Sequence, residues 1–406
     1  MIDPEDFGLQ NLPYGIISDA SGRKRPAVAF ADRVIDLDAL VGANVLDEES
    51  LRGAENLNAF LARGRTAWTS VRKRLQQLLG TPADAAERNA VAAAGLGRDA
   101  VTMHLPIAIG DYVDFYSSLE HATNLGRILR PGGEPLLPNY RHIPIGYHGR
   151  AGTVVPSGTP VSRPHGQLKA ADAAAPHFGP TGLLDVELEM GWIAGPGNLA
   201  GKPIAADDVR AHVFGYVLLN DWSARDIQSW EYQPLGPFLS KSFATSISAW
   251  IVTLDALEPF RVAEPARDPE PLPYLRARES WAYDVELEML LQTARMRERD
   301  QPAHPISRTN LRGMYWTVAQ QLAHVTANGA TIRPGDLFGT GTISGDRPGS
   351  AGSLIELTWR GRDPLALPDG ETRTFLEDGD TVIMRGRARR DGARIGFGEV
   401  TGTIRG

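Results

Sequence analysis

The sequence contains no cysteine. This absence excludes disulfide bridges, thiol catalysis, zinc fingers and iron–sulfur clusters. The chain also lacks an apolar run long enough to cross a bilayer, and residues 1–6 lack the basic start and apolar stretch of a signal peptide. The net charge is -7, with acids and bases mixed along the chain and no basic stripe. We therefore expect a cytoplasmic protein that has neither a nucleic-acid partner nor a membrane partner.

Residues that make turns are abundant, with 43 glycines and 29 prolines among 406 residues. Frequent turns predict many short strands, and a hydrophobic content of 42% is ample for a large core. The length favours two or three domains. We expect a mainly β protein. Its N-terminal domain, residues 1–105, is predicted to be a small β-barrel with an appended helix at about 57–79, and its C-terminal domain, residues 106–406, to be mostly β with few helices.

Several segments of the C-terminal domain carry more specific expectations. Apolar residues recur at helical spacing over 310–326, which predicts a helix there. Residues 146–150 are expected to form a turn and residues 165–182 a polar loop. Residues 213–219 read as a buried strand that ends at Asn220 and Asp221, and residues 355–357 are expected to place Glu356 on a strand.

An acidic and apolar alternation, DVELEM, spans residues 185–190. Strict alternation is typical of a half-buried strand, on which Glu187 and Glu189 share one face with Asp185 beside them. Packed carboxylates repel one another, and each is costly to keep ionised in an interior. A divalent cation removes that cost, and ligands that are all oxygen favour calcium or magnesium over zinc.

The same six residue types recur at 284–289, so the motif has a second copy. A Glu-x-Glu pair on an edge strand is more often a solvated face than a metal site. Spacing alone does not say which copy holds a metal, or whether either does. Context favours the first copy, because the segment 220–228 follows it, whereas a run rich in Arg and Glu follows the second.

Residues 114–118 lead into a predicted helix at 119–129, which Ser117 or Ser118 would cap. His121 would then lie in the first turn, where the partial positive charge of the helix disfavours protonation of the imidazole. A neutral histidine is what a general base requires. A lone histidine on a helix face more often has a surface role, although the nearby Asp114 favours a functional one.

Other kinds of site find no support in the sequence. Neither a Gly-x-Ser-x-Gly elbow nor a His-Glu-x-x-His motif occurs, so the chain has no signature of a serine hydrolase or a zinc protease. The Gly-rich run at 337–342 lacks the spacing of a nucleotide loop, so we do not expect it to bind phosphate.

Taken together, these segments resemble the fumarylacetoacetate hydrolase family nearly from end to end. The resemblance is carried by DYVDFYSS at 111–118, HATN at 121–124, GYHGR at 146–150, NDWSARDIQ at 220–228 and GTISG at 341–345. It implies an SH3-like N-terminal barrel, a C-terminal β-roll and a homodimer. It also implies metal-dependent hydrolysis of a carbon–carbon bond in fumarylacetoacetate to give fumarate and acetoacetate, the last step of tyrosine and phenylalanine degradation.

Two alternatives to this activity remain at this stage. One is a related enzyme, an acylpyruvate hydrolase or a decarboxylase or hydratase of 2-oxo acids. The decarboxylases and hydratases share the metal carboxylates but usually lack the His121 segment and the N-terminal barrel. The other is a non-catalytic scaffold stabilised by metal, which would be marked by a lost base or a lost ligand.

The resemblance also implies roles for individual residues. The ligands of a calcium or magnesium ion fall on Asp114, Glu187, Glu189 and Asp221, and a second magnesium position involves Asp221, Lys241 and Thr245. His121 is the implied base, oriented by Glu356, while Arg225, Gln228 and Lys241 surround the reacting carbonyl and the leaving group. The implied contacts to a small diketo acid substrate are Tyr116, Arg130, Tyr147, Tyr232 and Thr342.

Overall fold

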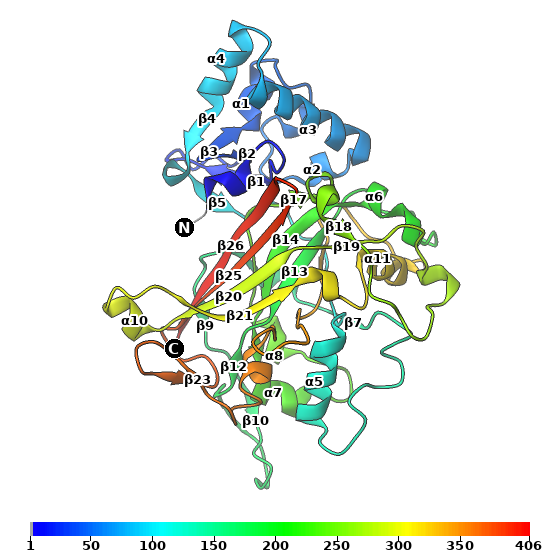
Figure 1. The fold of residues 1–406 in the computed structure, drawn as a ribbon, viewed down its shortest axis with the longest axis vertical. Coiled ribbons are helices and arrows are strands. Elements are labelled where there is room, and N and C mark those ends of the chain that lie inside the picture. Colours follow the sequence, from blue (N-terminus) through cyan, green and yellow to red (C-terminus); the bar gives the residue numbers. More distant parts are fainter. Residues whose placement is uncertain (1–2) are drawn as a thin grey trace.

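The computed structural model describes residues 3–406 (Figure 1). The N-terminal part contains a five-stranded antiparallel sheet in the order β4-β3-β2-β1-β5. Its strands are β1 Tyr14–Ser18, β2 Arg25–Phe30, β3 Arg33–Asp36, β4 Gly95–Gly97 and β5 Thr102–His104. Its helices are α1 Leu37–Gly42, α2 Asn58–Leu61, α3 Gly64–Gly80 and α4 Ala85–Ala94. The expected helix at 57–79 is thus confirmed, with a break between α2 and α3.

The rest of the chain is built on two larger sheets. The first has eight strands: the order is β7-β6-β22-β13-β14-β16-β8, and β17 also pairs with β14. These strands are β6 Tyr112–Phe115, β7 Gly146–His148, β8 Val154–Pro156, β13 Leu188–Ala194, β14 Val213–Asp221, β16 Thr245–Ile247, β17 Val252–Thr253 and β22 Leu337–Gly339. The second sheet has five strands in the order β21-β20-β25-β26-β9, namely β9 Val161–Ser162, β20 Glu286–Gln292, β21 His304–Asn310, β25 Thr381–Arg390 and β26 Ala393–Arg405.

Shorter elements complete this part. Four two-stranded ribbons are formed by β10 His165–Leu168 with β11 His177–Pro180, β12 Leu184–Asp185 with β15 Ser223–Ala224, β18 Arg261–Val262 with β19 Ala282–Tyr283, and β23 Leu365–Ala366 with β24 Thr372–Arg373. The helices are α5 Leu119–Leu129, α6 Val209–His212, α7 Arg225–Glu231, α8 Leu239–Ser242, α9 Leu254–Leu257, α10 Ala294–Glu298, α11 Val318–Thr326 and α12 Leu354–Leu357. The expectation of a mainly β protein with few helices is confirmed. Among residues 3–406, no helix has the length and apolar character needed to cross a membrane.

The main core lies between the two larger sheets. Leu218 of β14 packs against Gly386 of β25, and the same buried cluster includes Leu287 and Phe397 from the second sheet. Burial alternates along β25, so one face of this strand lies in the core and the other faces solvent. By contrast, β13 and β14 are buried along their whole length. Polar side chains on β13 and β14 are therefore held inside the protein, where they need partners.

The N-terminal part packs on the first sheet through a second core. The indole ring of Trp68 in α3 lies 5.1 Å from the ring of Phe214 in β14, and the ring of Tyr14 in β1 lies 5.4 Å from it. The helix α3 turns Trp68, Val71 and Leu75 inward at the spacing of one helix face. Phe214 lies near the start of β14, so these ring contacts are at the opposite end of the strand from Asp221.

Four local expectations differ from the structure. Glu356 lies on the short helix α12, not on a strand, because the carboxylate of Asp185 accepts hydrogen bonds from the Leu354 and Ile355 amides at 2.7 and 3.1 Å. The helix expected at 310–326 begins only at Val318, where Thr317 and Gln320 form a capping box. Residues 146–148 form strand β7 instead of a turn, and the loop expected at 165–182 contains the hairpin of β10 and β11.

Candidate active site

Four carboxylates meet at the ends of neighbouring strands of the first sheet. Asp114 comes from β6, Glu189 from β13 and Asp221 from the end of β14, while Glu187 lies just before β13. One oxygen from each of the four lies within 4.8 Å of the others, and all four side chains are buried. The pairing of β6, β22, β13 and β14 accounts for this meeting of residues that are far apart in sequence.

A glycine permits this close approach. A Cβ atom on Gly339 of β22 would lie 2.4 Å from Oδ1 of Asp114 and 3.0 Å from Oε2 of Glu189. The amide of Gly341 donates to the same two carboxylates, at 3.2 and 3.0 Å. The conformation of Gly341, with a φ of +78°, belongs to the left-handed region that favours glycine.

The four carboxylates of this cluster differ in their surroundings: some contact a basic side chain, and others have mainly acidic neighbours. Nζ of Lys241 contacts Glu187 and lies 2.8 Å from Oδ2 of Asp221, and Nη2 of Arg225 lies 2.8 Å from Oε1 of Glu187. Burial and then the neighbouring carboxylates raise the pKa values of Asp114 and Glu189 well above their usual range. Oε1 of Glu189 is buried and has no hydrogen-bond partner among residues 3–406.

This donor set fits a divalent cation. Hard cations such as Ca²⁺ and Mg²⁺ prefer carboxylate oxygens, and one of them would offset the negative charge that Lys241 and Arg225 leave unbalanced. The unpartnered oxygen of Glu189 supplies a donor that the protein itself does not use. Asp114, Glu187, Glu189 and Asp221 are the residues that could hold the ion.

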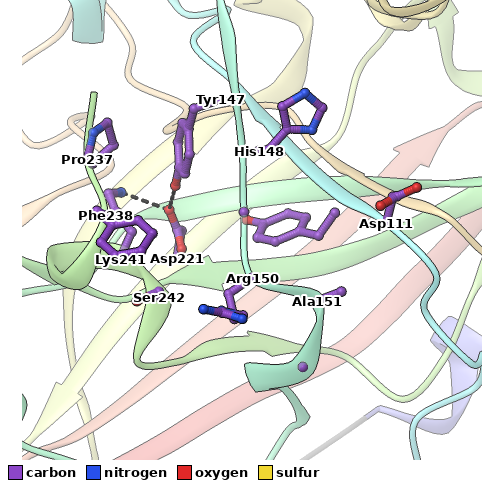
Figure 2. A pocket seen from close by; sticks show the side chains of 13 residues that line it. Asp111, Tyr147, His148, Arg150, Ala151, Asp221, Pro237, Phe238, Lys241 and Ser242 are labelled. Carbon is purple, nitrogen blue, oxygen red and sulfur yellow. Dashed lines mark hydrogen bonds and ion pairs between the residues drawn. The ribbon is translucent and has the colours of Figure 1, made fainter. Parts of the chain in front are cut away.

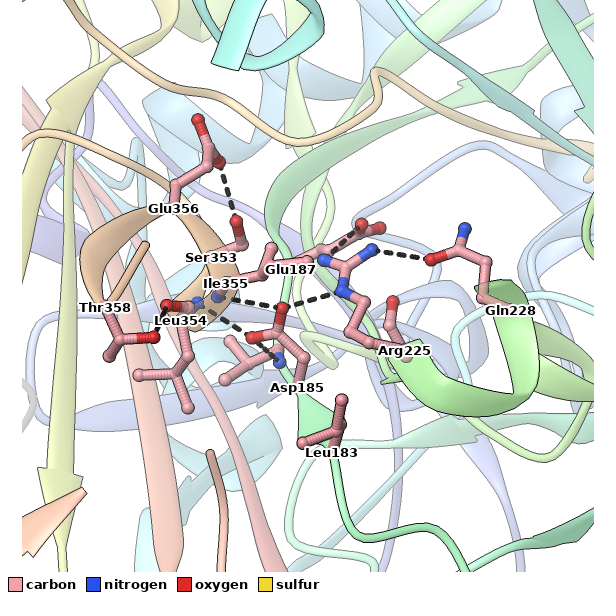
Figure 3. A network of polar contacts seen from close by, with 12 residues as sticks. Leu183, Asp185, Glu187, Arg225, Gln228, Ser353, Leu354, Ile355, Glu356 and Thr358 are labelled. Atoms are coloured by element: carbon pink, nitrogen blue, oxygen red, sulfur yellow. Dashed lines mark hydrogen bonds and ion pairs between the residues drawn. The ribbon is translucent and has the colours of Figure 1, made fainter. Parts of the chain in front are cut away.

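Asp185 does not join the cluster. The chain leaves strand geometry between β12 and β13, so the predicted single alternating strand at 185–190 is wrong, and its residues are buried instead of half-buried. Oδ2 of Asp185 accepts from Nε of Arg225 at 2.7 Å, and both its oxygens accept from the first amides of α12 (Figure 3). Asp185 therefore links Arg225 to the helix that carries Glu356.

The second copy of the motif has the properties of a solvated face. Glu286 is exposed, and Glu288 is half-buried with Nη2 of Arg308 at 2.8 Å from Oε1. In the register of the sheet, Glu286 lies opposite Arg387 and Glu288 opposite Arg385. Each acid thus faces a basic partner on the next strand. The preference for the first copy as the metal site agrees with this difference in surroundings.

Asp221 lies at the boundary between two cavities. Its Oδ2 accepts from the Tyr147 hydroxyl at 2.5 Å and contacts Lys241 (Figure 2). Its Oδ1 accepts from Oγ1 of Thr245 at 3.0 Å. Tyr147 and Lys241 line both cavities, so they form part of the wall between them. The cavity in Figure 2 has a volume of about 360 Å³ and lies toward His148 and Arg150.

The other cavity, of about 440 Å³, holds most of the candidate site residues and is called the main cavity below. Those that line it are Asp114, Tyr116, His121, Arg130, Tyr147, Glu187, Glu189, Arg225, Gln228, Tyr232, Lys241 and Thr342. Three candidates do not line it: Asp221, Thr245 and Glu356. Oγ1 of Thr342 and Nε of Arg130 are buried and have no protein partner among the described residues, whereas Gln228 accepts from Nη1 of Arg225 at 3.1 Å.

His121 and Glu356 form a buried pair beside the carboxylates. Nδ1 of His121 lies 2.6 Å from Oε2 of Glu356, and both side chains are almost fully buried. The expected helix α5 is confirmed, and Oγ of Ser118 caps it by accepting from the amide of His121 at 3.3 Å. Because the carboxylate accepts from Nδ1, the ring nitrogen Nε2 is left as the proton acceptor.

The state of Glu356 follows from its surroundings. Burial raises its pKa, but His121 and hydrogen bonds from His121, Ser353 and Asn124 outweigh burial and hold the pKa below its usual value. Nδ2 of Asn124 donates at 3.0 Å, as does the Ser344 hydroxyl, and Oγ of Ser353 donates at 2.6 Å. Glu356 is therefore ionised at neutral pH.

Sequence reasoning missed three of these supporting residues. Asn124 lies one turn after His121 on α5, and this spacing could have indicated a shared partner. Ser344 and Ser353 carry no such local signal, because their contact with Glu356 depends on how the loop 340–353 folds back.

Comparison with known families and proteins accounts for nearly the whole chain. Residues 10–106 match the family model described as fumarylacetoacetase N-terminal, and residues 112–405 match the one described as fumarylacetoacetate hydrolase C-terminal. The chain is 49% identical to a fumarylacetoacetase of Arabidopsis thaliana, covering 98% of this chain and 95% of that protein. It is 46% identical to the fumarylacetoacetase of Homo sapiens, covering 99% and 97%.

Solved structures show the same fold at low identity. A fumarylacetoacetate hydrolase from psychrophilic Exiguobacterium antarcticum aligns with a TM-score of 0.55 at 18% identity, over 97% of this chain and 99% of that one. A maleylpyruvate hydrolase from Sphingobium aligns with a TM-score of 0.51 at 15% identity, over 97% and 99%. The family models and the identity to the relatives, together with the fold, show that this chain belongs to the fumarylacetoacetase family.

Proposed function

We propose that this protein hydrolyses fumarylacetoacetate to fumarate and acetoacetate, the last step of tyrosine and phenylalanine degradation. The observation that carries the proposal is one cavity whose wall holds three of the four clustered carboxylates and a histidine that is paired with a buried glutamate. The sequence match to fumarylacetoacetases over nearly the full chain supports the same reaction. We further propose that the protein works as a homodimer in the cytoplasm.

The reaction begins when water adds to the ketone carbon next to the alkene. Nε2 of His121 takes the proton of the water, and Glu356 holds the ring and stabilises the imidazolium. A positioned general base typically accelerates a reaction roughly a hundred- to ten-thousand-fold. A Ca²⁺ or Mg²⁺ ion held by Asp114, Glu187, Glu189 and Asp221 would polarise the diketone oxygens as a Lewis acid.

Charge on oxygen then has to be stabilised twice. The first negative charge forms on the hydrated carbonyl, and the second on the enolate of acetoacetate when the carbon–carbon bond breaks. Arg225, Gln228 and Lys241 line the cavity and offer fixed donors, each worth about 3 kcal/mol in the transition state. The carbon of the enolate receives the proton that His121 took, which completes the cycle.

Substrate binding is assigned to residues on the walls of the main cavity. Arg130 and Thr342 each have a buried polar atom without a protein partner among residues 3–406, which suits them to binding a ligand. Tyr116, Tyr147 and Tyr232 contribute hydroxyl groups along the same walls. A second magnesium ion at Asp221, Lys241 and Thr245 is part of this proposal.

The domain division is likewise proposed as residues 1–105 and 106–406, an SH3-like barrel and a β-roll. The two family models support it, because one match ends at residue 106 and the other begins at residue 112. The N-terminal sheet has five antiparallel strands, in keeping with a small barrel.

The test is to give the purified protein fumarylacetoacetate, follow the loss of diketone absorbance and identify the products by NMR. Equal amounts of fumarate and acetoacetate, formed only without a chelator, are expected. Release of carbon dioxide would instead indicate a decarboxylase of the same family. An intact substrate, with metal bound to the protein, would contradict the proposal and favour another acylpyruvate.

A further inference from the structure

Tyr140 lies on the wall of the main cavity, among apolar side chains, and has not been given a role above. Its side chain is buried, yet its hydroxyl has no hydrogen-bond partner among the described residues of the protein. Most buried polar side-chain atoms in folded proteins do have a partner. Tyr140 therefore brings to the wall of the cavity a buried donor that no described group of the protein uses.

The position of Tyr140 is fixed by its neighbours. Its carbonyl oxygen accepts from Nε1 of Trp316 at 3.1 Å, and its amide donates to the carbonyl of Leu137 at 3.0 Å. Its ring packs between the rings of Tyr116 and Tyr315, with centroids 5.9 and 6.0 Å away. None of these contacts uses the hydroxyl, so the hydroxyl is not needed to hold the ring in place.

A row of aromatic rings relates Tyr140 to the proposed base. The ring of His121 lies 5.3 Å from that of Tyr116, which in turn contacts Tyr140. In this row the ring of Tyr116 thus separates Tyr140 from the base. The walls of the same cavity also include Leu125, Leu129, Leu136 and Ile145, which suit an uncharged carbon chain.

We propose that Tyr140 is a substrate-binding residue whose hydroxyl donates a hydrogen bond to the polar end of the acyl chain. The cavity would then select 1,3-diketo acids whose acyl chain ends in a hydrogen-bond acceptor, such as a carboxylate. This inference rests on the proposed function and deepens it. Burial also raises the pKa of Tyr140 well above its usual value, which keeps the hydroxyl protonated as a donor.

Selectivity follows from the apolar surroundings. Once an acyl chain fills this part of the cavity, water is displaced and the hydroxyl depends on the substrate for a partner. A site built to hydrogen-bond a substrate group strongly rejects an analogue that lacks the group, because the protein atom is left unpaired. A purely apolar pocket discriminates much less between a substrate and an analogue that differs only by a polar group.

The experiment compares Tyr140→Phe with Tyr315→Phe as the matched control. Tyr315 belongs to the same aromatic row, and its hydroxyl donates to the carbonyl of Arg141 at 3.4 Å, outside the main cavity. Each variant is assayed with fumarylacetoacetate and with a 1,3-diketo acid that has the same reacting part but an acyl chain ending in a methyl group. Thermal unfolding is measured in parallel.

For Tyr140→Phe, kcat/KM for fumarylacetoacetate should fall roughly tenfold or more, mainly through KM. The methyl-ended substrate and the Tm should change little, and Tyr315→Phe should leave kcat/KM for both substrates unchanged. Unchanged kinetics in Tyr140→Phe, or an equal loss with both substrates, would overturn the inference while the proposed function stands. A wild-type protein that hydrolyses neither substrate would overturn the proposed function and this inference with it.

Discussion

Nδ1 of His121 and Oε2 of Glu356 lie 2.6 Å apart, although the two residues are 235 positions apart in the chain. Asn124, Ser344 and Ser353 occupy the remaining positions around the carboxylate. The carboxylate therefore cannot rotate away from the imidazole without losing several hydrogen bonds. This relationship fixes the imidazole ring and leaves Nε2 of His121 as its proton acceptor.

Replacing either member of this pair should lower turnover without removing the metal. His121→Ala removes the base and should reduce kcat at least about a hundredfold. Glu356→Gln keeps the size of the side chain but cannot stabilise the imidazolium, so kcat should fall while KM changes little. Steady-state kinetics with metal analysis of each variant checks this. Near-wild-type turnover in His121→Ala would show that the base has been wrongly assigned.

The two copies of the acidic motif provide a matched test of the metal site. Glu189→Gln removes one of the four clustered carboxylates and should weaken binding of Ca²⁺ or Mg²⁺ and lower activity together. Glu288→Gln makes the same change at the equivalent place in the solvated copy of the motif, and it should change neither ion binding nor activity. Calorimetric titration with each ion measures the affinity. An equal loss of ion affinity in the two variants would contradict the assignment of the first copy of the motif as the metal site.

Removing the metal should make stability depend on pH in a definite direction. Burial and neighbouring carboxylates raise the folded pKa values of Asp114 and Glu189 above the unfolded value of about 4. Stability from such groups is fully present below the unfolded pKa and is lost as the pH rises through the folded pKa. In chelated protein, Tm should therefore fall as the pH is raised from about 5 toward the folded pKa values.

Saturating Ca²⁺ or Mg²⁺ should abolish that fall, because the ion replaces the protons on these carboxylates. Glu187 does not interfere, since its lowered pKa affects stability only at more acidic pH. Differential scanning fluorimetry over the same pH range, with and without the ion, makes the comparison. A Tm of the chelated protein that stays level or rises with pH would count against a metal-neutralised cluster.

Asp185 should matter for stability more than its solvated counterpart. Asp185→Asn leaves Arg225 and the first turn of α12 without their buried carboxylate. This change should lower the free energy of unfolding by about 3–5 kcal/mol. The control Asp284→Asn affects a partly exposed side chain whose Oδ2 lies 3.6 Å from Nη1 of Arg312. This change should lower the free energy of unfolding by less than about 1 kcal/mol. Unfolding in urea measures both values. A cost below about 1 kcal/mol for Asp185→Asn would show that the buried link carries little energy.

The sequence predicted best those features that local patterns encode. The helix expected at 57–79 and the capped helix α5 follow from apolar spacing and from a capping residue within a few positions of the helix start. The grouping of Asp114 with Asp221, by contrast, came from the family resemblance, because strand order does not follow from local pattern.

The failures have physical reasons of the same kind. Periodicity treats Asp185, Glu187 and Glu189 alike, yet Arg225 and the amides of α12 draw Asp185 away from the other two. The segment 355–357 is too short for its period to separate a strand from a helix. The late start of α11 could have been foreseen, because Thr317 and Gln320 have the spacing of a capping box.

The most direct test of a metal-dependent site is the return of activity to chelated protein as Ca²⁺ or Mg²⁺ is titrated back, with the bound ion counted at each step. Turnover of fumarylacetoacetate should be negligible without the ion and should rise in proportion to the bound ion, and Glu189→Gln should show neither binding nor recovery at the same ion concentrations. Full turnover by protein that demonstrably holds no ion would contradict the account.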